Sequence, residues 1–129
     1  MEIFTETITE ALINKMLDRS VLEHKLIANN VANVNTKNYV PLTTKNSETF
    51  EAILASFEEQ AEEVRQSQLK SIVKDWDITA EIAAETNKDT VAIDDEMAKL
   101  SMNTLHYQAL LRAKSELKDL MTVAVQGVK

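Results

Sequence analysis

The chain has 129 residues, a formal net charge of −7 and 44% apolar residues, which suits one small domain. It contains one glycine and one proline, where average usage would give roughly nine and six. Sandwiches and barrels need many tight turns, so this scarcity favours long helices. Nucleic-acid-binding surfaces are rich in Lys and Arg, whereas acidic residues outnumber basic ones in this chain. We therefore expect no nucleic-acid partner.

The composition also limits the covalent and membrane chemistry of the chain. It has no cysteine, which excludes disulfides and thiolate metal sites. The N-terminal residues include neither a basic region nor a long apolar run, so we expect no Sec-type signal peptide. No stretch approaches the roughly eighteen apolar residues of a membrane span, and we expect no direct membrane insertion.

Residues 1–33 form the first predicted segment, with a helix over 5–33. Ile8, Leu12 and Met16 recur at steps of four, which places them on one helix face. Beyond Leu17 the apolar residues spread around the helix, a pattern typical of a helix that touches several neighbours.

Residues 34–46 are predicted to form an extended, Asn-rich linker. Asparagine is poor inside helices but good at caps and turns, and Pro41 pushes the residue before it toward extended geometry. The simplest interpretation is a helix stop followed by a loop. The alternative is that the side-chain amides bond neighbouring backbone or one another. The asparagines are Asn29, Asn30, Asn33, Asn35 and Asn38.

Residues 47–93 are predicted to contain a short middle helix, over 47–67, and then a partly extended or flexible arm. Strand-like composition occurs at 72–73 and 91–93, and Trp76 and Ile78 alternate with acidic residues as a half-buried strand would. Residues 86–89 have turn-like composition. Two alternatives stay open for this segment, a hairpin or an arm that orders only on binding.

Residues 94–129 form the last predicted segment, a helix over 94–126 that is capped by Asp94 or Asp95 and uninterrupted until Gly127. At about 1.5 Å per residue it reaches roughly 50 Å. We expect two apolar seams, one to pair with the first helix and one in need of another partner. One seam contains Met97, Leu100, Tyr107 and Leu111. The other contains Leu110, Ala113, Leu117, Leu120 and Ala124.

Residue patterns typical of catalysis are missing. The sequence has no phosphate-binding, dinucleotide-binding, zinc-protease or nucleophile-elbow motif. His24 and His106 are its two histidines, and neither belongs to a Glu-x-x-His pair. Asp75 and Asp77 suit a solvated turn better than a cation site. We therefore expect no enzymatic activity, no cofactor and no metal.

Two stretches carry a resemblance to a known family. Residues 28–39 resemble the N-terminal signature of bacterial flagellar rod and hook proteins, approximately A-x-N-[IVL]-A-N-x-x-T-x-x-Y. The family has Pro-Gly where this chain has Lys37-Asn38, and Asn38 can take the left-handed conformation that such a turn needs. Residues 95–111 resemble the C-terminal region of the proximal rod members, and two kinds of proximal rod protein fit. The motif residues in register are Asn30, Asn33, Thr36 and Tyr39.

The resemblance implies a structural subunit of the proximal rod that polymerises through its terminal helices and transmits torque. The implied partners are copies of itself, other rod proteins, ring or adaptor proteins of the basal body and the flagellar export apparatus. The implied location is the rod in the periplasmic space, after synthesis in the cytoplasm and export without a cleaved signal peptide. Phe50 and Leu54 fit a Phe-x-x-x-aliphatic export-gate element, as do Phe4 and Ile8.

The resulting prediction is a mainly α protein whose long N- and C-terminal helices pack as a coiled-coil-like bundle. The four motif residues are expected to fix the chain where it leaves the first helix. The alternative function is a soluble helical adaptor or secretion chaperone, which would be a folded dimer. The predicted rod-packing residues are Leu12, Leu22, Leu26, Leu110, Leu117 and Leu120.

Overall fold

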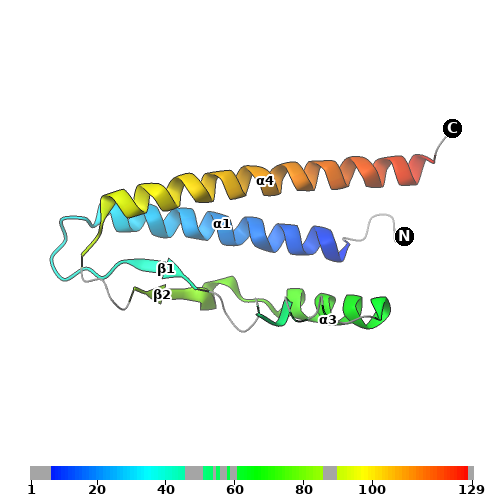
Figure 1. Cartoon of the computed structure of the whole chain (residues 1–129), viewed down its shortest axis with the longest axis horizontal. Helices are drawn as coiled ribbons and strands as arrows, with labels where there is room; N and C mark the ends of the chain where they lie inside the picture. Colours follow the sequence, from blue (N-terminus) through cyan, green and yellow to red (C-terminus); the bar gives the residue numbers. More distant parts are fainter. Residues whose placement is uncertain are drawn as a thin grey trace.

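Two long helices dominate the computed structural model, which describes residues 7–45, 51–53, 55, 58, 61–85 and 90–127. Helices α1 (Ile8–Ala32) and α4 (Ile93–Gln126) run antiparallel and side by side (Figure 1). At about 1.5 Å per residue α4 is roughly 51 Å long and α1 roughly 38 Å, and the C-terminal end of α4 reaches beyond α1 (Figure 1). The predicted mainly α fold with paired terminal helices is confirmed.

Residues next to each end of α1 cap the helix. The Thr7 hydroxyl accepts a hydrogen bond from the Glu10 N–H at 3.1 Å, which makes Thr7 the N-cap. At the other end the Asn33 N–H donates to the Asn29 carbonyl at 3.2 Å. The helix therefore stops where the asparagine cluster predicted, and Asn38 has the expected left-handed φ of 63°.

The start of α4 differs from the expectation. Ala92 is the N-cap and makes no side-chain capping bond, so the expected cap at Asp94 or Asp95 is wrong. The acidic residues 94–96 instead occupy the first turn, where negative charge is favourable against the helix dipole. Gly127 ends the helix with a φ of 75°, as its position predicted.

The middle helix is shifted along the chain. Residues 51–53 and 55 are helical, but the following helix α3 (Glu62–Asp75) continues through 72–73, where strand-like chain was expected. That expectation was wrong because Leu69 and Val73, four residues apart, are buried on one helix face. Tertiary burial at helical spacing outweighs the β-branched composition.

Two short strands pair across a long sequence separation. Strand β1 (Leu42–Thr44) runs antiparallel to β2 (Ile82–Ala84). Neither expected strand exists: Trp76 leads into the 3₁₀ helix η2 (Ile78–Glu81), and residues 91–92 are irregular before α4 begins. The expected turn at 86–89 lies outside the described residues.

Helix α1 is the central layer of the molecule. The arm, defined here as residues 39–45 and 61–85, lies along α1 on the side away from α4 (Figure 1). Ile53, Leu69 and Trp76 form a buried apolar cluster there. Ile8, Leu12, Met16 and Ile72 pack against this cluster. Within the described residues, no helix combines the length and apolar character needed to cross a bilayer.

The inner face of α4, toward α1, follows one heptad-like series. Its least exposed residues recur at steps of three and four, the spacing of a coiled-coil seam. The expected division into two seams was wrong, because members of both share this face and polar residues interrupt it. The inner face consists of Glu96, Leu100, Asn103, Tyr107, Leu110, Lys114, Leu117 and Met121.

The outer face of α4 follows a second series with the same spacing, and every member is exposed. It is the more apolar of the two faces, with one charged residue among its eight positions. The outer face consists of Ala98, Met102, Leu105, Ala109, Ala113, Glu116, Leu120 and Val123.

Candidate structural site at the polar corner

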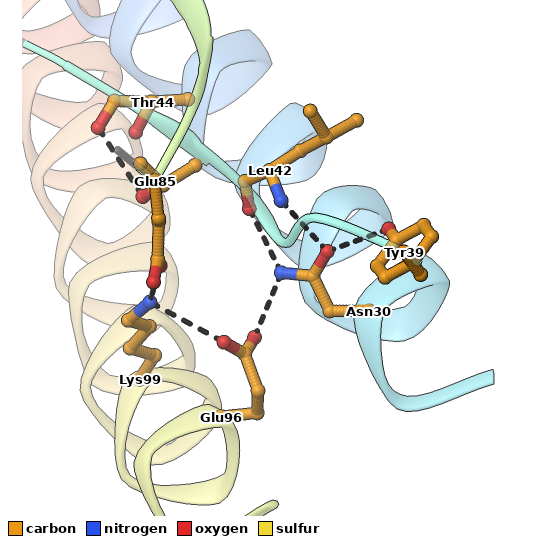
Figure 2. Close-up of polar contacts among 8 residues, drawn as sticks. Asn30, Tyr39, Leu42, Thr44, Glu85, Glu96 and Lys99 are labelled. Atoms are coloured by element: carbon orange, nitrogen blue, oxygen red, sulfur yellow. Dashed lines mark hydrogen bonds and ion pairs between the residues drawn. The ribbon is translucent and has the colours of Figure 1, made fainter. Parts of the chain in front are cut away.

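Asn30 is the centre of a buried hydrogen-bond network where α1, the linker and α4 meet (Figure 2). Its Nδ2 donates to the Leu42 carbonyl at 2.8 Å and to Glu96 Oε2 at 3.1 Å. Its Oδ1 accepts from the Tyr39 hydroxyl at 2.8 Å and from the Leu42 N–H at 2.9 Å. The amide thus uses both donors and both acceptor positions, and the residue is 0% exposed.

Asn29 and the other motif residues continue this network into the turn that follows α1. Asn29 Nδ2 donates to the Tyr39 hydroxyl at 2.9 Å. Asn33 Nδ2 donates to the Asn29 carbonyl at 2.8 Å, and its Oδ1 accepts from the Thr36 hydroxyl at 3.0 Å. The amides of Asn29, Asn30 and Asn33 bond backbone and other side chains, so the alternative to a simple helix stop holds for these three of the five asparagines.

A charged group completes the network on the α4 side. Lys99 forms ion pairs with Glu85 and, at 3.3 Å, with Glu96 (Figure 2). Partial burial by itself would lower the pKa of Lys99. The hydrogen bond to Glu85 and the charges of Glu96 and Glu85 outweigh that effect and raise the pKa above 10.5. We call this whole network, including the residues of the two preceding paragraphs, the polar corner.

A second buried polar cluster, around Glu81, joins the arm to α1. Arg19 Nε pairs with Glu81 Oε1 at 2.7 Å, and Glu81 is 0% exposed. Trp76 Nε1 donates to Glu81 Oε2 at 3.2 Å, while Lys15 Nζ donates to the Trp76 carbonyl at 2.9 Å. A buried carboxylate needs such partners because leaving it unpaired costs several kcal/mol.

One further polar pair lies between the long helices. The Ser20 hydroxyl donates to Asn103 Oδ1 at 2.8 Å, and Asn103 Nδ2 donates to the Ser20 carbonyl at 2.8 Å. A buried asparagine on a coiled-coil seam fixes register at a cost in stability. This pair joins α1 to α4 at one position along their shared length.

Several site residues were missed by sequence reasoning. Glu96 and Lys99 lie within the resembling stretch but were assigned no role, and Glu81 and Arg19 were not singled out. For Glu96 a signal was available, because it lies four residues before Leu100 and so shares the heptad-like spacing of the face that packs on α1. The Arg19–Glu81 pair had none, since its partners lie on elements far apart in sequence.

The predicted packing leucines have different environments. Leu26 on α1 is 8% exposed and belongs to the buried core. Leu12 and Leu22 on α1, and Leu110 and Leu117 on the inner face of α4, are half-buried. Leu120 is 68% exposed. The first five contribute to the fold of the single chain, and Leu120 lies on the outer face.

The other candidate residues lie outside the polar corner or outside the described residues. Phe50, Leu54 and Phe4 lie outside the described residues. Asp77 Oδ1 accepts from the Thr79 hydroxyl at 2.6 Å, which lowers the pKa of the Asp77 carboxyl, so it closes a turn. Among the described residues no cluster of three side chains suited to a metal ion occurs.

The fold and the polar corner together define an elongated helical-hairpin protein with one apolar helix face left uncovered. Over 98% of its length, this chain is similar to the flagellar basal body rod protein FlgB of Bacillus subtilis (strain 168), with 28% identity across 134 aligned positions that cover 99% of that protein. The resemblance to flagellar rod proteins is thus confirmed, and it extends through the middle of the chain. No family model matches, and no solved structure matches.

Proposed function

We propose that this chain is a structural subunit of the proximal rod of the bacterial flagellar basal body, and that it polymerises through its terminal helices to transmit torque. The likeness to a rod protein over almost the whole chain supports the class. The observation that carries polymerisation is the outer face of α4, which is apolar, long and exposed.

The outer face exposes large apolar side chains along most of α4. Met102, Leu105, Leu120 and Val123 are 55%, 60%, 68% and 55% exposed. From Ala98 to Val123 the face extends roughly 38 Å along the helix. Contiguous apolar patches of this kind mark interaction sites, and the three- and four-residue spacing suits another helix.

The proposed contact joins different surfaces of neighbouring subunits. Head-to-tail contacts that do not close generate open helical filaments, and a tube built from them repeats each contact along its length. Because close-packed helix contacts deform little, such a tube can carry rotation. The partners in this proposal are copies of the chain, other rod proteins and ring or adaptor proteins of the basal body.

The motif residues have a supporting role in the proposal. Asn30 and Tyr39 hold the linker against the end of α1, while Glu96 joins α4 to the same point. This corner fixes how the two long helices are presented to a neighbouring subunit. The Asn33–Thr36 hydrogen bond closes the turn that follows α1.

We further propose export through the flagellar type III system and a final location in the rod within the periplasmic space. This part of the proposal rests on the family resemblance alone. Phe50 and Leu54 are the proposed export-gate element. If a Phe50→Ala variant is secreted at the normal rate, that assignment is wrong, whatever the chain does in the rod.

The test of polymerisation changes the outer face without touching the fold. In the host bacterium, a Leu105→Asn/Leu120→Asn variant should be produced and exported but should fail to restore motility to a strain lacking the native gene. The purified variant should keep the helix content and free energy of unfolding of the unmodified chain, because both side chains are exposed.

The matched control is Ser115→Asn, an exposed position of α4 outside both faces. It should restore motility fully. If the double variant restores motility as well as this control does, the outer face is not the polymerisation surface. If the unmodified gene itself fails to complement and basal bodies lack the protein, the rod assignment is wrong.

A further inference from the structure

We propose that the outer face of α4 in one copy of the chain docks on a groove between α1 and α4 of the next copy. In this contact Glu116 of the outer face lies beside Lys25 of the groove, and Leu120 enters the groove. The inference rests on the proposed function and deepens it, because it names the surface that the outer face meets. We call this surface the α1–α4 groove; Val21, His24, Lys25, Thr104 and Tyr107 line it, above the buried Ser20–Asn103 pair.

The α1–α4 groove is space that the chain does not fill with its own side chains. Its volume is about 360 Å³, whereas well-packed interiors have few voids larger than a water molecule. A cavity of about 150 Å³ accommodates a benzene molecule, so the groove has room for a side chain of leucine size. Ser20 and Asn103 at its base already bond each other, so the base does not require a polar ligand.

An exposed apolar row continues the groove along α4. Met97, Thr104 and Leu111 are spaced by seven residues, which places them in one row on the helix. Thr104 lines the groove, and Met97 and Leu111 are both 43% exposed on either side of it. Val21, on the α1 side, is 41% exposed. The surface around the groove therefore suits an apolar helix face.

Charge favours the outer face as the occupant. Glu116 is the charged member of the outer face, and its side chain is 64% exposed. Lys25 lies at the groove, and none of the described residues that line the groove is acidic. Lys25 is exposed, and the α1 positions three and four residues from it hold no carboxylate. In a chain of net charge −7, a contact that pairs opposite charges is favoured over one that brings acidic groups together.

Three other grooves bordered by described residues match the outer face less well. Each is lined by a carboxylate, from Glu23, Asp18 or Glu63, which would lie against Glu116. The groove with Glu23 also includes Ala109, a member of the outer face itself. The groove with Asp18 is lined by four charged residues, and covering them with an apolar face is unfavourable.

The residues around Glu116 allow a close approach to the groove. Ala109 and Ala113 precede it on the outer face, and small side chains at a contact let two helices lie closer together. Leu120 follows Glu116 by one turn and is 68% exposed. When Glu116 lies beside Lys25, Leu120 is therefore the apolar side chain next in line to fill the groove.

The two surfaces lie on different sides of α4. They share no residue, and Tyr107 of the groove belongs to the inner face. Each copy therefore offers one surface and receives the other. A contact between different surfaces leaves one of them free at each end of a row of copies, so that further copies can add.

Charge reversal tests the pairing in the host bacterium. Lys25→Glu and Glu116→Lys should each reduce the diameter of the swim ring about two-fold or more, because each places like charges across the contact. Lys25→Glu/Glu116→Lys restores opposite charges and should swim to within about 20% of the unmodified diameter. The matched control is Lys37→Glu, at an exposed position outside both surfaces, which should swim normally.

Compensation in the double variant would arise between copies. Because Ser20 lies opposite Asn103 in the antiparallel pair, residues 25 and 116 of one chain are roughly 25 Å apart along the helices. The Arg112–Glu116 pair that Glu116→Lys removes is exposed, so its loss has little effect on the fold. Each purified variant should keep the helix content of the unmodified chain.

Normal motility of both single variants would overturn the proposal, and so would a double variant that swims no better than the weaker single variant. The Leu105→Asn/Leu120→Asn variant separates this failure from failure of the proposed function. If that variant does not swim while the charge reversals have no effect, the outer face is an assembly surface and the α1–α4 groove is not its partner.

The absence of cysteine allows a second measurement. A Val21→Cys/Leu120→Cys chain in isolated, oxidised basal bodies should give covalent dimers and larger multimers on denaturing gels. The two positions cannot bridge within one chain, because about 25 Å of α4 separates residue 120 from Asn103, which lies opposite Ser20. Absence of multimers would overturn the proposal. Dimers from Leu120→Cys alone would overturn it too, because they would show that two outer faces pair with each other.

Discussion

The carboxamide of Asn30 on α1 donates to the carboxylate of Glu96 on α4, with 3.1 Å between Nδ2 and Oε2. The two residues are 0% and 2% exposed, so water cannot replace the bond. Since the same amide also holds both backbone groups of Leu42, one side chain joins three elements. The polar corner therefore acts as a joint between the helical hairpin and the arm.

Because the Asn30 carboxamide joins these three elements, the free energy of unfolding should depend strongly on it. Asn30→Asp removes two donors and places a second carboxylate against Glu96, so it should lower the free energy of unfolding by about 3 kcal/mol or more. Asn30→Ala avoids the repulsion and should cost about 2–3 kcal/mol. Urea denaturation followed by circular dichroism measures both values.

An exposed asparagine provides the control for this charge change. Asn35→Asp alters the same chemistry on the surface and should shift the free energy of unfolding by less than about 0.5 kcal/mol. An Asn30→Asp variant as stable as this control would show that the network does not hold the corner.

The Arg19–Glu81 pair predicts a difference between breaking a buried pair and removing it. Arg19→Met leaves the Glu81 carboxylate buried without its cation and should cost about 3 kcal/mol. Arg19→Met/Glu81→Met removes both charges and should recover part of that loss. A double-mutant cycle with Glu81→Met gives the coupling energy from urea denaturation.

The exposed pair Arg112–Glu116 is the comparison, because its side chains are 83% and 64% exposed. Its coupling energy in the same experiment should stay below about 0.5 kcal/mol. Equal coupling for the two pairs would mean that burial does not strengthen the Arg19–Glu81 interaction.

Long-range burial decides which parts of this fold could be predicted from the sequence. The bounds of α1 and the end of α4 follow from local signals, namely Thr7, the asparagine cluster and Gly127, whereas the start of α4 at Ile93 has no side-chain cap. By contrast, α3 crosses a stretch with strand-like composition, because Leu69 and Val73 are buried against a helix about sixty residues earlier in the chain. No local pattern carries that information.

The candidate site divides in the same way. The asparagine motif was visible because its spacing is local and specific. Its partners Glu96 and Lys99 were not, because what distinguishes them is the approach of α4 to Asn30 in the folded chain. The seam expectations failed for a related reason, since polar residues at Glu96 and Asn103 occupy the inner face and apolar ones the outer face.

The raised pKa of Lys99 predicts a loss of stability at alkaline pH. Because the pKa in the folded chain lies above 10.5, the protonated amine favours folding. Its contribution is complete below pH 10.5 and disappears as the pH rises through the raised folded value. As the pH rises through and beyond the ordinary lysine pKa of about 10.4, the unmodified chain should therefore lose more free energy of unfolding than a Lys99→Met variant does.

An exposed lysine isolates this effect from the general alkaline titration. Lys37→Met should follow the unmodified chain across the same pH range. Parallel curves for all three proteins would show that the ion pairs of Lys99 with Glu85 and Glu96 do not contribute to stability.

Leu117 and Leu120 predict opposite behaviour for the two faces of α4. Leu117 is half-buried on the inner face, so Leu117→Ala should lower the free energy of unfolding of the isolated chain by about 1–2 kcal/mol, less than for a fully buried leucine. Leu120 is 68% exposed, and Leu120→Ala should change it by less than about 0.5 kcal/mol. Urea denaturation of the two purified variants compares the same change of side chain, three residues apart on one helix. Equal destabilisation would mean that Leu120 is covered within the single chain, and the outer face would then lose its main reason to bind a neighbour.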